Sequence, residues 1–150
     1  MKKSMTFLFL FFAMQYSYAQ ENICIGKRYT IYSDVLQENR EYLVYTPASY
    51  ESAGHEDVRY PVIYLIDAEL YFHAMTAVLN TYTRGRQPVM PECIMVGIVN
   101  TDRTRDLTPT ASAYGRNGQL RADGIVTGGG GDNFYTFITG ELRDAIDTSY

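Results

Sequence analysis

The fold of this chain is decided by the stretch Tyr60-Pro-Val-Ile-Tyr-Leu-Ile-Asp67. A nearly continuous apolar run that an aspartate ends is typical of a strand buried on both faces, as in a mostly parallel sheet. A second such run, Cys93 to Val99, follows Pro91. Between the runs, residues at spacings of three and four predict a helix with one stripe facing the sheet. That stripe consists of Tyr71, Ala74, Met75, Val78, Leu79 and Tyr82.

The segments on either side extend this pattern. Residues 27–32 and 41–46 are rich in β-formers, which predicts two antiparallel strands joined by a polar loop over 33–40. After the second buried run, another helical stripe is expected, with Asp132 as its N-terminal cap. Its residues are Phe134, Phe137, Ile138, Leu142 and Ala145. Two antiparallel strands followed by parallel strands with crossover helices predict an α/β fold.

The stretch from Asn100 to Gly131 shows no sustained periodicity. Connections longer than about 12 to 15 residues are usually functional or mobile, so we expect this one to line a site. Its last residues, Gly128 to Gly131, precede a helix but lack the Lys-Ser/Thr ending of a phosphate-binding P-loop. They are interpreted as a flexible loop that enters the helix.

The N-terminus has the features of a secretory signal. Lys2 and Lys3 precede an apolar run from Phe7 to Met14, and small residues at a cleavage spacing end at Ala19. The run is shorter than the roughly 20 residues that span a bilayer, so no stable membrane anchor is expected after cleavage. We therefore predict a signal peptide over 1–19, a single domain over 20–150, and a periplasmic or extracellular location.

Composition excludes several classes of protein. Hydrophobic residues make up 46% of the chain and charged residues 20%, as in ordinary globular proteins. The formal net charge is −4, with scattered basic residues, so nucleic acid is not an expected partner. The two cysteines, Cys24 and Cys93, are no disulfide framework. Cys93 is expected to be a buried, unreactive thiol, and a Cys24–Cys93 bridge is the alternative.

Three stretches together carry a resemblance to a known family. They are residues 60–73, residues 96–109 with Thr-Asp-Arg-Thr-Arg-Asp-Leu-Thr-Pro, and residues 128–134 with Gly-Gly-Gly-Gly-Asp-Asn-Phe. From Tyr29 to the end, the chain resembles the Putative esterase family of the α/β-hydrolase superfamily, which includes esterase D and ferric-enterobactin esterases. The resemblance implies a serine carboxylic-ester hydrolase that acts through an acyl-enzyme on a small-molecule ester and needs no cofactor.

The catalytic triad of that family cannot be assembled from these residues. The sequence contains no G-x-S-x-G motif, and both histidines, His55 and His73, lie in the first half. The resemblance therefore implies that nucleophile, acid and base lie beyond Tyr150. We expect an incomplete α/β-hydrolase sheet, truncated before the nucleophile and inactive alone. A competing hypothesis is a non-catalytic exported binding module with the same fold.

The family would place one part of its machinery in this half, namely a backbone donor of the oxyanion hole. The resemblance assigns this role to the amide of Glu69, with the amide of Ala68 as second choice. The family commonly has glycine where Ala68 stands, which bears on how freely the turn adopts left-handed dihedrals. The alternative is a plain turn between strand and helix.

Polar residues after the second buried strand are further candidates. Asn100, Arg103, Arg105 and Asp106 follow the carboxyl end of that strand, where open α/β sheets place their ligand crevices. An arginine there could bind an acidic group of the substrate through two hydrogen bonds. Alternatively, Arg103 or Arg105 pairs with Asp106 or Asp102 and pins the loop.

No metal site is predicted. Asp67, Glu69 and His73 fall within one short segment, but their spacing matches no zinc signature. His73 is expected to be a helix residue packed near the edge of the sheet. His55 is expected to be solvated.

Overall fold

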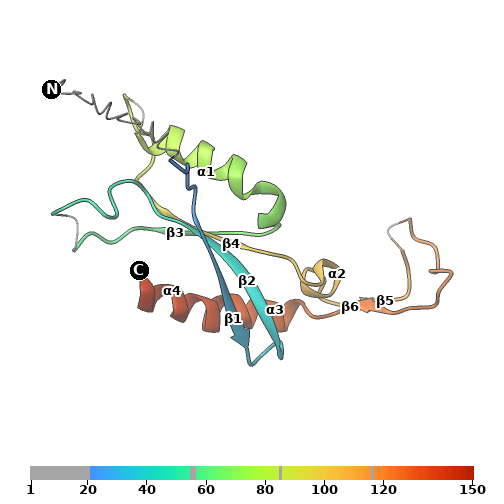
Figure 1. The fold of residues 1–150 in the computed structure, drawn as a ribbon. Coiled ribbons are helices and arrows are strands. Elements are labelled where there is room, and N and C mark those ends of the chain that lie inside the picture. The colour runs from blue at the N-terminus through green and yellow to red at the C-terminus, as the bar shows by residue number, and fades with distance from the viewer. Residues whose placement is uncertain (1–20, 55–56, 85, 116) are drawn as a thin grey trace, which may run out of the picture.

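The computed structural model of this protein describes residues 21–54, 57–84, 86–115 and 117–150 (Figure 1). The expected signal peptide over 1–19 and His55 lie outside these ranges. Within them, no helix combines the length and apolar character needed to cross a membrane.

A four-stranded sheet forms the centre of the fold, in the order β1-β2-β4-β3. Its strands are β1 (Lys27–Ser33), β2 (Glu38–Tyr45), β3 (Val62–Leu65) and β4 (Ile94–Ile98). β2 pairs antiparallel with both β1 and β4, whereas β3 and β4 are parallel. The predicted α/β architecture, with two antiparallel strands followed by parallel ones, is confirmed.

Helices cover both faces of this sheet (Figure 1). Helix α1 (Ala68–Arg84) packs on one face, over Cys93 and Met95. The other face carries one continuous helical segment made of α3 (Gly131–Phe137), the π-helical turn η1 (Ile138–Leu142) and α4 (Arg143–Ser149). All five residues of β4 are buried, because alternate side chains enter the two cores.

The turn between β1 and β2 is shorter than the loop predicted over 33–40. The strands run through Ser33 and start again at Glu38, and Gln37 adopts a left-handed φ of 54°. Ser33 and Arg40 are both fully buried. Their polarity marked them as loop residues, but Glu141 accepts from Ser33 and Asp106 accepts from Arg40, so polar residues extend the strands here.

The buried stripe of α1 differs from the predicted one. Tyr71, Val78 and Tyr82 are exposed, and of the predicted stripe only Leu79 is fully buried. The packing of Ala68 against Gly97 of β4 sets the rotation of α1 about its axis, which turns a neighbouring stripe inward. The buried residues are Ala68, Phe72, Thr76 and Leu79.

The segment between β4 and α3 is less irregular than its sequence indicates. It contains α2 (Arg103–Asp106) and a small antiparallel pair, β5 (Ala111–Ser112) and β6 (Thr127–Gly128). Its closing glycines pack tightly, contrary to the expected flexible loop. Gly128 and Gly129 have φ of 94° and 83°, and a Cβ on Gly129 would lie 2.9 Å from the Ala111 nitrogen. Only glycine fits there.

The predicted helix cap at Asp132 is wrong. Gly130 occupies the position before α3 and makes no side-chain cap, while Asp132 lies within the first turn. The Thr108 carbonyl accepts the Gly131 amide at 3.1 Å. The folded connection thus supplies an acceptor for the helix start, which removes the need for a side-chain cap.

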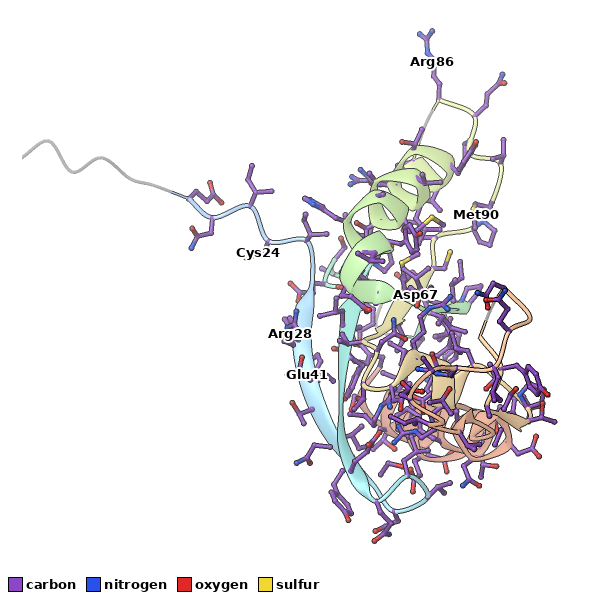
Figure 2. All side chains as sticks on the ribbon, turned by 90° about the vertical axis from the view of Figure 1, so that its right-hand side faces the viewer. Cys24, Arg28, Glu41, Asp67, Arg86 and Met90 are labelled. Atoms are coloured by element: carbon purple, nitrogen blue, oxygen red, sulfur yellow. The ribbon has the colours of Figure 1, made fainter. Side chains whose placement is uncertain are left out.

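The two cysteines are not bridged. Cys93 is buried and Cys24 is exposed, both as free thiols. Figure 2 shows Cys24 on the extended segment that precedes β1. Burial raises the pKa of the Cys93 thiol, and the thiol donates to the Pro91 carbonyl at 3.4 Å. The expectation of a buried Cys93 is confirmed, and the alternative bridge does not form.

Candidate functional site

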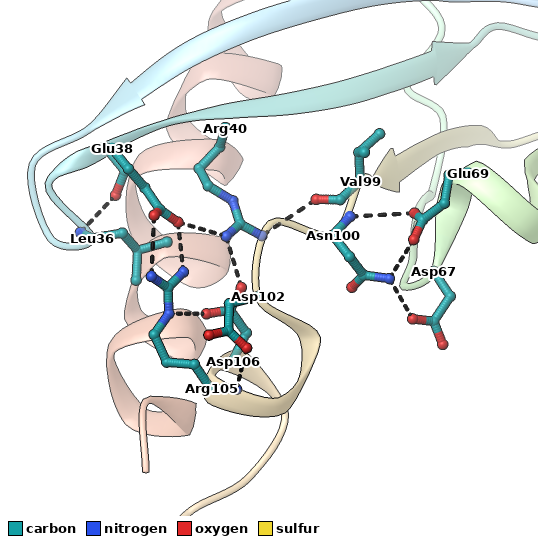
Figure 3. A network of polar contacts seen from close by, with 11 residues as sticks. Leu36, Glu38, Arg40, Asp67, Glu69, Val99, Asn100, Asp102, Arg105 and Asp106 are labelled. Carbon is teal, nitrogen blue, oxygen red and sulfur yellow. Dashed lines mark hydrogen bonds and ion pairs between the residues drawn. The ribbon is translucent and has the colours of Figure 1, made fainter. Parts of the chain in front are cut away.

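The carboxyl ends of β3 and β4 lie at the same edge of the sheet because the two strands are parallel. The chain leaves β3 through Asp67 into α1, and it leaves β4 through Asn100 toward α2. Residues from two separate stretches therefore meet at this edge, Asp67 and Glu69 from one and Asn100 from the other (Figure 3).

Asp67 forms the turn between β3 and α1 in a left-handed conformation, with φ of 59°. Its carboxylate accepts from Asn100 Nδ2 at 2.6 Å and, on both oxygens, from Arg103 at 2.8 and 3.1 Å. The Arg103 bonds, together with that from Asn100, hold the pKa of Asp67 below its usual value. Asp67 is therefore a charged residue of the turn, and both of its carboxylate oxygens accept hydrogen bonds.

Asn100 connects the two carboxylates on either side of Ala68. Its side-chain amide donates to Glu69 Oε1 at 2.6 Å as well as to Asp67, and its backbone amide donates to Glu69 Oε2 at 3.2 Å. Ala68 itself is buried against Gly97 of β4, where a Cβ would lie 2.7 Å from the Ala68 Cβ. The first residues of α1 are thus held from both sides.

The backbone N–H groups of Ala68 and Glu69 lie in the first turn of α1, where a helix has no internal acceptors. No residue in the described part of the chain accepts a hydrogen bond from either group. The positive end of the helix dipole lies at the same place. This turn can therefore donate to an anionic oxygen, which is the chemistry predicted for the Glu69 and Ala68 amides.

The other two predicted residues, Arg105 and Asp106, belong to a neighbouring ion-pair network (Figure 3). Arg105 Nε donates to Asp106 at 2.7 Å, and the same guanidinium forms two bonds with Glu38, at 2.6 and 3.1 Å. These hydrogen bonds lower the pKa of Glu38 to about 2. Asp102, the alternative partner, instead caps α2 by accepting the Arg105 amide.

Arg40 completes this network and was not among the predicted residues. It is fully buried, donates to Asp106 at 2.7 Å and Glu38 at 2.8 Å, and lies over the Phe134 ring at 5.2 Å. Arg40 alternates with Tyr42 and Val44 along β2 and therefore lies on the same face of the strand, which was the available indication of its burial. A buried arginine on an apolar face implies a carboxylate partner.

The structure places His73 away from both clusters. Its side chain is exposed on α1 rather than packed at the sheet edge, which corrects that expectation. It lines a cavity of about 620 Å³ beside Val44, Tyr45 and Thr76. Tyr45 pairs with Met95 near the amino end of β4, so this cavity lies at the opposite end of the sheet from Asp67. The described residues contain no cluster of His, Cys, Asp and Glu that could hold a metal ion.

The family model described as "Putative esterase" matches residues 33–150 of the chain. The chain belongs to this esterase family. The match includes both polar clusters and the turn between β3 and α1. No curated protein matches the chain at a significant level.

Solved structures of hydrolases share this fold. An IroE-like serine hydrolase from Shewanella oneidensis is 34% identical, with a TM-score of 0.73 over 82% of this chain and 38% of its own. Siderophore hydrolase EstA from Aspergillus nidulans is 20% identical, with a TM-score of 0.67 over 89% of this chain and 48% of its own. The chain thus spans less than half the length of each.

A more distant neighbour is the enterobactin esterase FES from Shigella flexneri. It is 19% identical, with a TM-score of 0.55 over 86% of this chain and 27% of its own. At these identities EstA and FES support the fold alone. The sheet edge that carries Asp67 and Asn100 is therefore part of an α/β-hydrolase framework.

Proposed function

We propose that this chain contributes the oxyanion-binding half of a serine carboxylic-ester hydrolase, whose nucleophile, acid and base lie outside residues 1–150. The observation that carries the proposal is the turn after β3, where a helix begins at the carboxyl edge of the sheet with two backbone N–H groups that donate to none of the described residues. Membership of the esterase family supports the same chemistry.

The proposed mechanism is acyl transfer through a serine ester. Attack on the ester carbonyl forms a tetrahedral intermediate, and its negative charge collects on one oxygen. The amides of Glu69 and Ala68 stabilise that oxygen in the full-length enzyme. A single fixed donor of this kind lowers the barrier by about 3 to 4 kcal/mol. Arg103 balances the charge of Asp67, so this carboxylate does not oppose the developing oxyanion.

The proposed substrates are small-molecule esters of the siderophore type. Two of the solved neighbours carry the names siderophore hydrolase and enterobactin esterase, which makes siderophore esters the first class to test. Export through a signal peptide cleaved after Ala19 would place the enzyme in the periplasm or outside the cell. Sequencing the N-terminus of the mature protein tests that cleavage, and fractionation of the cells tests the location.

The central experiment uses the full-length gene product. We expect it to hydrolyse short nitrophenyl esters and to be labelled once per chain by a fluorophosphonate probe, whereas residues 21–150 alone should do neither. A full-length product that neither turns over esters nor reacts with the probe would refute the enzyme and favour a non-catalytic binding module.

A further inference from the structure

The segment that carries the two amides is held by side chains from a different part of the chain. Asp67 and Glu69 flank Ala68, and both carboxylates accept from Asn100, at 2.6 Å each. Arg103 adds a bidentate contact, with one hydrogen bond to each carboxylate oxygen of Asp67. All of these donors follow β4, so the loop after β4 braces the turn after β3.

The turn needs such bracing because its backbone conformation is unfavourable. A left-handed φ is sterically unfavourable at a residue with a Cβ, although aspartate tolerates it better than most residues. Asp67 nevertheless adopts a φ of 59°. Paired, charge-assisted hydrogen bonds between guanidinium and carboxylate fix both the distance and the plane of the two groups. The side chain of Asp67 thus holds its own backbone in place.

The direction of the Ala68 and Glu69 amides depends on this turn. Rotation about the backbone of Asp67 would turn the following peptide N–H groups, while the burial of Ala68 against Gly97 limits movement of the helix itself. A misdirected donor contributes little, because hydrogen bonds weaken steeply with angle. The brace can therefore decide whether the donors meet the oxyanion.

We propose that Asn100 and Arg103 are positioning residues, which act through Asp67 and Glu69 to hold the Ala68 and Glu69 amides in the orientation that binds the oxyanion. This inference rests on the proposed esterase function. It assigns Arg103 to the brace rather than to the substrate, since Nε and Nη2 of its guanidinium are already bonded to Asp67.

The test compares Asn100→Ala and Arg103→Ala with wild type in the full-length enzyme. Counting sites with the fluorophosphonate probe gives kcat per folded site, so partial unfolding does not affect the result. We expect kcat for a neutral nitrophenyl ester to fall about 10- to 100-fold with KM within about threefold, since complete loss of one donor costs 10²- to 10³-fold. Affinity for a boronic acid, which mimics the tetrahedral state, should fall in parallel.

Two further variants separate bracing from other roles. Arg103→Lys keeps the charge but loses the planar, paired hydrogen bonds of the guanidinium with Asp67, so it should stay at least fivefold slower than wild type. Arg143→Ala, which breaks an exposed pair with Asp144, is the control and should leave kcat unchanged.

Each alternative outcome is distinct. An inactive wild type refutes the proposed function itself. With an active wild type, unchanged kcat in both alanine variants overturns the brace. A raised KM confined to anionic esters would instead show that Arg103 binds substrate, and full activity of Arg103→Lys would show that only its charge matters. Either result overturns the inference while leaving the esterase function intact.

Discussion

Replacing Asp106 by asparagine should destabilise the protein strongly although the change removes only one charge. The side chains of Arg40 and Asp106 are 0% and 1% exposed, and their ion pair measures 2.7 Å. The network holds two guanidiniums and two carboxylates, so Asp106→Asn leaves one positive charge uncompensated in the interior. Breaking a buried pair costs about 3 to 5 kcal/mol. Because Glu38 remains in contact with Arg40, we expect the lower end, about 3 kcal/mol.

The measurement is urea unfolding of the full-length protein, followed by circular dichroism, with Asp144→Asn as the matched control. Asp144 makes an ion pair of similar length with Arg143, at 2.8 Å, but both side chains are more than half exposed. An exposed pair contributes little to stability, because water screens its charges. The reasoning fails if Asp106→Asn costs less than about 1 kcal/mol or cannot be told apart from the control.

Three other predictions concern packing, pH and thiol chemistry. Gly97→Ala should lower the free energy of unfolding by about 1 to 3 kcal/mol, because the new Cβ would lie 2.7 Å from the Ala68 Cβ; an unchanged urea midpoint would contradict the close packing. The pKa of Glu38 is lowered from 4.5 to about 2, so its stabilising contribution is complete above about pH 4.5 and is lost as the pH falls toward 2. The urea midpoint should fall over that window, and less so in Glu38→Gln. An aromatic disulfide reagent should react with Cys24 in the folded protein but with Cys93 only after unfolding, since Cys93 is buried; rapid labelling of both would disprove the packing of Cys93.

The sequence predicted where the strands end, but not which polar residues meet there. Asn100 and Arg103 were placed after one buried strand, and Asp67 was identified only as the residue that ends another. Strand ends can be recognised locally, because a polar residue interrupts an apolar run. That Arg103 contacts Asp67 rather than Asp102 or Asp106 depends on the two strands being neighbours and parallel.

Local sequence patterns could not predict the rotation of α1 or the burial of Arg40, for a related reason. The exposed Tyr71 and Tyr82 have the same spacing as core residues, and only the packing of Ala68 on Gly97 selects the face of α1 that turns inward. Polarity places Arg40 in a loop, yet its partner Asp106 is 66 residues away and makes its burial possible.

The type of the four strands of the main sheet and of the helices on its two faces, and their order along the chain, follow from the sequence itself, because hydrophobic periodicity is a property of neighbouring residues. The left-handed turn at Asp67, the brace formed by Asn100 and Arg103, and the buried pair of Arg40 with Asp106 arise only in the folded protein. The brace and the buried pair join segments that are far apart along the chain, and the free energy of such contacts depends on distances that only the packed sheet and helices set.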